Sequence, residues 1–158
     1  MIICFCLVVF YSFFDGFSFS GGPTDPATGL PPFGNCSKCH SGVTNAGPGQ
    51  IKLNVPSFYI PGSVYPIEVK VIQRGAPKFG FQATIVNSQN LFVGQFDTTG
   101  SDSKCQLVFN DTSLITHTNQ SHRINGPDSA VYTFLWKAPA VNVGQVKMYV
   151  SAVGANND

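Results

Sequence analysis

The chain has 158 residues, which is enough for one domain with a hydrophobic core. Charged residues make up only 11% of it, the formal net charge is +1 and no cluster of Lys or Arg is present, so the sequence argues against a nucleic-acid-binding protein. The 16 glycines, 11 prolines and 14 phenylalanines are typical of short strands joined by tight turns.

The N-terminus begins with an unbroken apolar run, MIICFCLVVFYSFF, over residues 1–14. This run is shorter than the roughly 20 residues that span a bilayer, and small residues follow it between Gly16 and Gly22. The pattern predicts a secretory signal peptide over residues 1–20, although no basic residue precedes Lys38. We therefore expect an exported protein, in the periplasm, at the cell surface or outside the cell, without a transmembrane segment in its mature chain.

A loop rich in Gly, Pro, Ser, Thr and Asn is expected next, over residues 21–49, because no helical or strand period is visible there. A structureless run of this length is uncommon inside a domain unless it has a function. Holding a cofactor would be such a function.

Short segments that alternate apolar and polar residues follow, over residues 50–158. We expect strands near residues 51–55, 64–73, 79–87, 91–97, 105–110, 113–118, 130–137 and 145–153. Seven or eight strands at this spacing, with no amphipathic helix between them, predict an all-β fold with the architecture of an antiparallel β-sandwich.

The motif that carries chemistry lies in the loop, where Cys36-Ser37-Lys38-Cys39-His40 fits C-x-x-C-H. The two thiols of this spacing add to the two vinyl groups of one haem, and the adjacent His40 then binds the iron from the proximal side. Covalent haem attachment takes place outside the cytoplasm, in agreement with the signal peptide. The motif therefore predicts one haem c, linked through Cys36 and Cys39.

The distal iron ligand has three candidates: His117 at the end of an expected strand, and, as weaker ones, Met148 and His122. Two histidine ligands would close both axial positions, which favours electron transfer over catalysis at the iron. No catalytic motif is present elsewhere, so we expect an electron-transfer protein and not an enzyme. The sequence does not indicate its redox partner.

Three alternatives stay open, because removal of the signal peptide leaves three cysteines, Cys36, Cys39 and Cys105. In the first, a disulfide joins Cys36 or Cys39 to Cys105 in a cofactor-free secreted adhesion or recognition module. In the second, the three cysteines and His117 hold a structural zinc in the same module. The third is a redox-active dithiol formed by Cys36 and Cys39.

Four blocks of the sequence resemble the choice-of-anchor V domains of bacterial secreted proteins, relatives of the Reeler domain of reelin and spondins. The blocks are SGGPTDPATGLPPFGNCSKCHSG at 20–42, KFGFQ at 78–82, ITHT at 115–118, and YTFLWKAP at 132–139 with NVGQV at 142–146. The resemblance implies an immunoglobulin-like β-sandwich on an exported protein.

In its bacterial branch, the same resemblance implies C-x-x-C-H at Cys36, Cys39 and His40, together with a histidine at the position of His117. Animal members keep a His-Thr or His-Ser pair without haem and carry a disulfide near the position of Cys105, so an architectural role for His117 stays open. Relatives usually continue with another strand beyond the position where this chain stops, at Asp158. We therefore expect either a fragment or an unpaired edge strand, and the latter would allow self-association by strand exchange.

Overall fold

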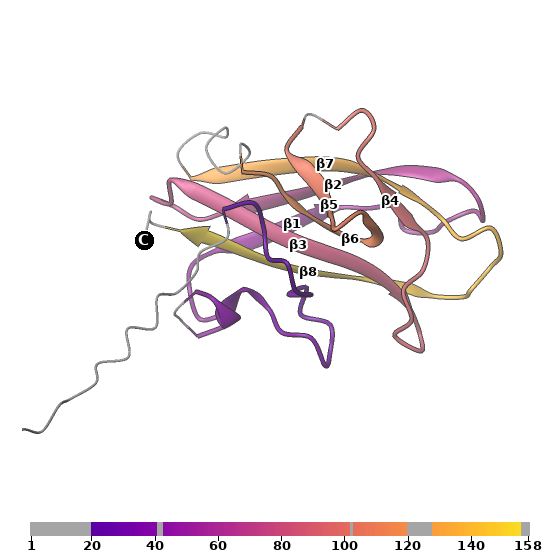
Figure 1. Ribbon diagram of the computed structural model, residues 1–158, viewed down its shortest axis with the longest axis horizontal. Coiled ribbons are helices and arrows are strands. Elements are labelled where there is room, and N and C mark those ends of the chain that lie inside the picture. Colours follow the sequence, from indigo (N-terminus) through magenta and orange to yellow (C-terminus); the bar gives the residue numbers. More distant parts are fainter. Residues whose placement is uncertain (1–19, 41–42, 102, 120–127, 156–158) are drawn as a thin grey trace, which may run out of the picture.

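The computed structural model describes residues 20–40, 43–101, 103–119 and 128–155. Within these residues, eight strands form two four-stranded antiparallel sheets that pack face to face (Figure 1). The predicted signal peptide, apart from Ser20, lies outside the described residues. None of the described residues belongs to a helix long and apolar enough to cross a membrane.

The first sheet has the strand order β1-β2-β7-β4 and the second has the order β5-β6-β3-β8. The strands of the first sheet are β1 (Gln50–Asn54), β2 (Val64–Ile72), β7 (Ser129–Lys137) and β4 (Gln95–Asp97). Those of the second sheet are β5 (Cys105–Val108), β6 (Asp111–His117), β3 (Lys78–Asn87) and β8 (Val146–Ala155). The predicted all-β sandwich is confirmed.

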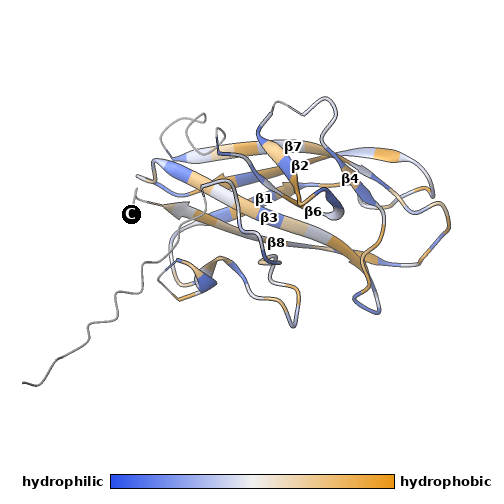
Figure 2. Cartoon of the chain, in the orientation of Figure 1, coloured by the Kyte–Doolittle hydropathy of each residue, from blue (hydrophilic) through white to orange (hydrophobic). Residues whose placement is uncertain are grey.

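The core lies between the sheets, where the inward positions of the alternating strands meet, and Figure 2 shows this alternation along the chain. Tyr132 and Phe134 of β7 pack on Phe81 of β3, with ring centroids 4.5 and 5.9 Å apart. The Tyr132 hydroxyl donates a hydrogen bond to the carbonyl oxygen of Phe79, at 2.8 Å. The buried aromatic rings thus contact both sheets, which fixes how β3 lies against β7.

Strand β3 is covered on both faces, although its sequence alternates as a half-buried strand would. Its outward side chains Gln82 and Thr84 are 0% exposed, because the segment that precedes β1 packs over them (Figure 1). The Gln82 side-chain amide donates to the carbonyl oxygens of Pro23 and Asp25 and accepts a hydrogen bond from the Ala27 N–H. The first part of the predicted loop, around residues 23–27, is therefore a cover on the outer face of the second sheet.

Two predicted details differ from the structure. The strand expected over 91–97 is reduced to β4, because Phe92 makes only an isolated bridge to Val86. The predicted loop contains a short 3-10 helix, η1 (Cys36–Lys38). Strand β8 forms one edge of the second sheet, and self-association through it stays a prediction.

Candidate functional site

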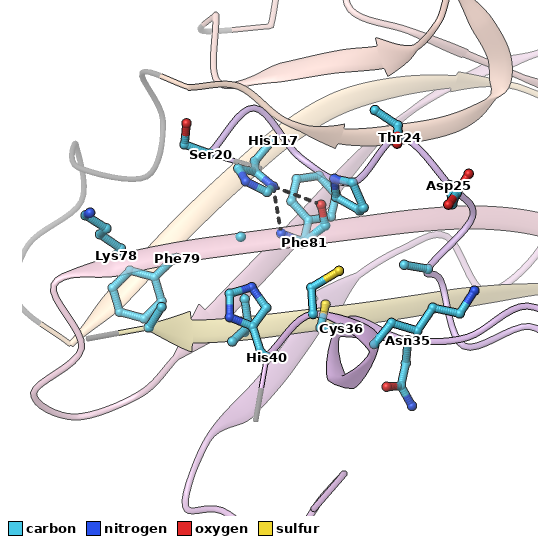
Figure 3. A pocket seen from close by; sticks show the side chains of 17 residues that line it. Ser20, Thr24, Asp25, Asn35, Cys36, His40, Lys78, Phe79, Phe81 and His117 are labelled. Atoms are coloured by element: carbon cyan, nitrogen blue, oxygen red, sulfur yellow. Dashed lines mark hydrogen bonds between the residues drawn. The ribbon is translucent and has the colours of Figure 1, made fainter. Parts of the chain in front are cut away.

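A pocket of about 350 Å³ opens on the outer face of the second sheet, between η1, the preceding segment and the ends of β3, β6 and β8. Its walls bring together Cys36, Cys39 and His40 with His117, which lies on the opposite side (Figure 3). The C-x-x-C-H motif and the histidine favoured as distal ligand thus share one pocket, although they lie far apart in the sequence.

The floor of the pocket is formed by small side chains. Gly80 of β3 is in register with Val153 of β8, and Lys78 is in register with Ala155. Val153 and Ala155 point outward, because the intervening positions of β8 pack into the core. The floor between the two histidines is therefore largely apolar.

The motif side chains are positioned by the tight turn of η1. The Asn35 side chain accepts a hydrogen bond from the Ser37 N–H at 2.9 Å and so caps this turn. The N–H groups of Cys39 and His40 both donate to the Cys36 carbonyl oxygen, at 3.3 and 3.0 Å. These bonds fold the motif back on itself and keep the side chains of Cys36, Cys39 and His40 at one wall.

Cys36 is fastened to β8 through Ser151. Its N–H donates to the Ser151 hydroxyl at 3.0 Å, and that hydroxyl donates to the Cys36 sulfur at 3.2 Å. Burial raises the pKa of the Cys36 thiol, and the hydrogen bond from Ser151 opposes this shift only in part. Redox-active dithiols depend on a lowered thiol pKa, so the structure argues against that alternative.

His117 lies where the ladder between β3 and β6 ends. The last paired residues are Gln82 and Thr116, and beyond them the His117 ring occupies the space beside β3. Its Nδ1 atom is 3.2 Å from both the N and the O of Phe81. A Cβ atom at Gly80 would be 2.7 Å from Cε1 of this ring, so the absence of a side chain there makes room for it.

The weaker distal candidates have different outcomes. Met148 points into the sandwich, where it packs against the core, and it does not line the pocket. This orientation excludes it from the site. His122 lies outside the described residues. Of the candidates that the structure describes, His117 is therefore the one at the pocket.

The predicted disulfide to Cys105 is not found in the structure, in which Cys36, Cys39 and Cys105 form no disulfide with one another. Cys105 is buried, and its sulfur faces the Thr133 carbonyl oxygen of the first sheet at 3.8 Å. Its strand β5 and Ser151, which holds Cys36, lie at opposite edges of the second sheet, about 14 Å apart at three strand spacings. A disulfide requires Cβ atoms within about 4.5 Å.

The predicted zinc site is not supported either. Among the residues that the structure describes, no group of three or more His, Cys, Asp or Glu side chains is arranged to hold a metal ion. The ligands of that site, Cys36, Cys39, Cys105 and His117, are all described, and Cys105 faces the interior while Cys36 lies on the outer face.

The donor set fits a flat macrocycle better than a bare ion. Two thiols and one imidazole lie at one wall and a second imidazole lies at the other, with Val153 and Ala155 among the residues of the floor. A macrocycle that spans the pocket can contact side chains on both walls, whereas a bare metal ion needs all its ligands close to one point. The pocket volume lies within the range of small-molecule and cofactor sites.

Comparisons with known proteins give one structural likeness. No family model matches the chain. The chain is similar to the Reelin-N domain of F-spondin, with 19% sequence identity and a TM-score of 0.48, over 68% of this chain and 72% of that one. Membership of the family that the sequence blocks resemble, and of its bacterial branch, stays a prediction.

Proposed function

We propose that the protein is a small exported c-type cytochrome that transfers electrons at or outside the cell surface. Cys36 and Cys39 hold one haem covalently, His40 is the proximal ligand and His117 is the distal ligand. The observation that carries the proposal is the shared pocket, in which a histidine from β6 faces the C-x-x-C-H motif across a floor of small residues.

Each part of the pocket has a role in this proposal. Cys36 and Cys39 would hold the group on the segment before β1, while the side chains of Val153 and Ala155 leave room for it beside the sheet. When bound, a haem supplies one-electron redox chemistry. With an imidazole on each side, the residues leave no axial position for a substrate, which favours electron transfer over catalysis.

The charges at the pocket also suit this group. Lys38 and Lys78 are among the lining residues, together with Asp25. The two lysines outnumber the one carboxylate, so the pocket favours a ligand that carries anionic groups, such as carboxylate substituents.

The test is a pyridine haemochrome spectrum of the full chain, produced in a host with a cytochrome maturation system and denatured before measurement. We expect a c-type band that survives denaturation. The double variant Cys36→Ala/Cys39→Ala should lose this band, while Cys105→Ala should keep it, because Cys105 faces the core and not the pocket. A colourless protein from that host would refute the proposal.

A second candidate function is a cofactor-free secreted recognition module. It is favoured by apolar side chains that the structure leaves exposed, including Ile51 and Leu53 on β1 at 41% and 43% and Phe58 in the following loop at 73%. Such surfaces often mark sites where another molecule binds. A colourless protein that nevertheless folds as described would favour this candidate.

A further inference from the structure

The meeting point of β3 and β6 contains a local break that the proposed function does not by itself explain. Both strands are long enough to continue their ladder, yet pairing stops at Gln82 and Thr116. From there, the His117 side chain takes the place of a backbone partner, and its ring is only 8% exposed.

The first element of this arrangement is the space above Gly80. A Cβ atom there would lie 2.7 Å from Cε1, 3.0 Å from Nε2 and 3.1 Å from Nδ1 of His117. Any other residue at this position would therefore displace the ring. The backbone of Gly80 is not in the left-handed region, so close approach of His117 and not a special conformation explains this glycine.

The second element is the peptide group of Phe81. Its N–H and its carbonyl oxygen both lie 3.2 Å from Nδ1 of His117. The same carbonyl accepts a hydrogen bond from the Thr116 hydroxyl at 2.7 Å and retains a second lone pair. Nδ1 can therefore accept from the N–H or donate to the oxygen, depending on which ring nitrogen carries the proton.

We propose that Gly80 and the Phe81 peptide group are the positioning elements of His117, where Gly80 supplies the space for the ring and Phe81 holds its Nδ1 atom by a hydrogen bond. In the haem-free protein Nδ1 accepts from the Phe81 N–H, and the proton is on Nε2. Ligation through Nε2 requires that this proton is released to solvent and that Nδ1 takes one up, which it then donates to the Phe81 oxygen. The role at the iron rests on the proposed function, whereas the positioning of the ring does not.

The haem-free full chain tests the positioning directly, by long-range proton–nitrogen NMR of the histidine rings. We expect His117 to show one tautomer, protonated at Nε2, in the wild type and in the control Gly47→Ala, whose added methyl would make only an ordinary contact, 4.0 Å from the Gly49 backbone nitrogen. In Gly80→Ala the ring is displaced, so its two nitrogen resonances should move toward tautomer averaging. Unchanged resonances in Gly80→Ala, or a wild type protonated at Nδ1, would overturn the proposal.

The haem-loaded protein tests the consequence at the iron. We expect the wild type and Gly47→Ala to be low-spin, Gly80→Ala to contain high-spin iron, and added imidazole to restore the low-spin spectrum. If Gly80→Ala disturbed only the fold, added imidazole would not restore the low-spin spectrum. If no variant takes up haem, the proposed function fails, while the NMR result on the haem-free chain still decides the positioning.

A second measurement covers the case in which Gly80→Ala does not fold. The Phe81 amide should exchange with solvent about five to ten times faster in haem-free His117→Ala than in the wild type, because one buried hydrogen bond is lost. The Thr84 amide, further along β3, serves as the internal control. Equal protection of the Phe81 amide in both proteins would show that His117 is not its partner.

Discussion

The outer face of the second sheet has two ends under one covering segment, and they are built in opposite ways. At the closed end, Gln82 and Thr84 are fully buried and hydrogen-bonded, Gln82 to the cover and Thr84 to Ser113 of β6. At the open end, the His117 ring lies over Gly80, and a pocket remains between this ring, the C-x-x-C-H motif and Val153. The covering segment is thus hydrogen-bonded to the sheet at one end and separated from it by the pocket at the other.

The closed end is held by hydrogen bonds between residues that are far apart in the sequence. The Gln82 side chain satisfies Pro23, Asp25 and Ala27, and the Gln106 side chain donates to the Gly21 carbonyl oxygen. Each such bond contributes about 1 kcal/mol net, and a buried group left without its partner costs more. The pocket at the open end is therefore a property of a stable scaffold and not of a loosely attached loop.

The largest effect is expected when the open end is filled. In Val153→Phe an aromatic ring replaces a small part of the pocket floor, so covalent haem should be lost while the fold is kept. The matched control is Val131→Phe, on the outer face of the first sheet. Haemochrome yield and far-ultraviolet circular dichroism measure the two properties, and full haem incorporation in Val153→Phe would place the haem elsewhere.

The next effect concerns the wall opposite the motif. His117→Ala removes the second imidazole, so the low-spin spectrum of the loaded protein should become high-spin while the covalent c-type band is unchanged. Met148→Leu, which alters the core and not the pocket, is the control and should stay low-spin. A low-spin spectrum in His117→Ala would remove this residue from the site.

A smaller effect is expected when the closed end is broken. Gln82→Ala leaves the Ala27 N–H and two carbonyl oxygens of the cover without their partner, so the free energy of unfolding should fall by about 2–4 kcal/mol. Urea denaturation measures this loss, with Gln89→Ala in the exposed turn after β3 as control. Equal stability of the two variants would show that Gln82 does not hold the cover.

The smallest effect concerns the contact between motif and β8. Ser151→Ala removes a hydrogen bond that lowers the pKa of Cys36, so this pKa should rise further above its ordinary value of 9.0. The haem-free Ser151→Ala variant should therefore need a higher pH for alkylation of Cys36 than the wild type. Alkylation at an unchanged or lower pH would contradict the contact.

The same shift predicts how stability depends on pH. Because the pKa of Cys36 is raised in the folded chain, the unfolded chain ionises first as the pH rises through about 9.0. The haem-free wild type should thus lose stability between that pH and the folded value, and Cys36→Ala should lose less. Denaturation curves across this range provide the measurement.

The strands could be predicted from the sequence because each inward row is apolar while polar residues recur in the outward row, such as Glu68 and Lys70 in β2 and Thr133 in β7. The cover could not be predicted, because its partners Gln82 and Ser151 are more than 50 residues away in sequence from the groups they bind. Local composition indicates only that residues 21–49 form no regular element. It contains no information on what they lie against.

The part of the site that is contiguous in sequence could be predicted, because it depends on local spacing alone. Cys36, Cys39 and His40 form a motif whose spacing carries its own chemical meaning, whereas His117 was identified only as one of three candidates. Gly80 was not identified at all, although a glycine inside an alternating strand is a signal of close approach by another group. Only the fold shows that this group is the His117 ring.

The central claim is that the open end holds the haem, and the most direct test is the amide NMR spectrum of the loaded protein compared with that of the haem-free protein. The amides of Gly80, Val153 and Ala155 should show large shifts or paramagnetic broadening, while that of Ile85, on the inner face of β3, should change little. Unchanged amides at the pocket floor in a protein that carries haem, or a chain that takes up no haem, would contradict the account.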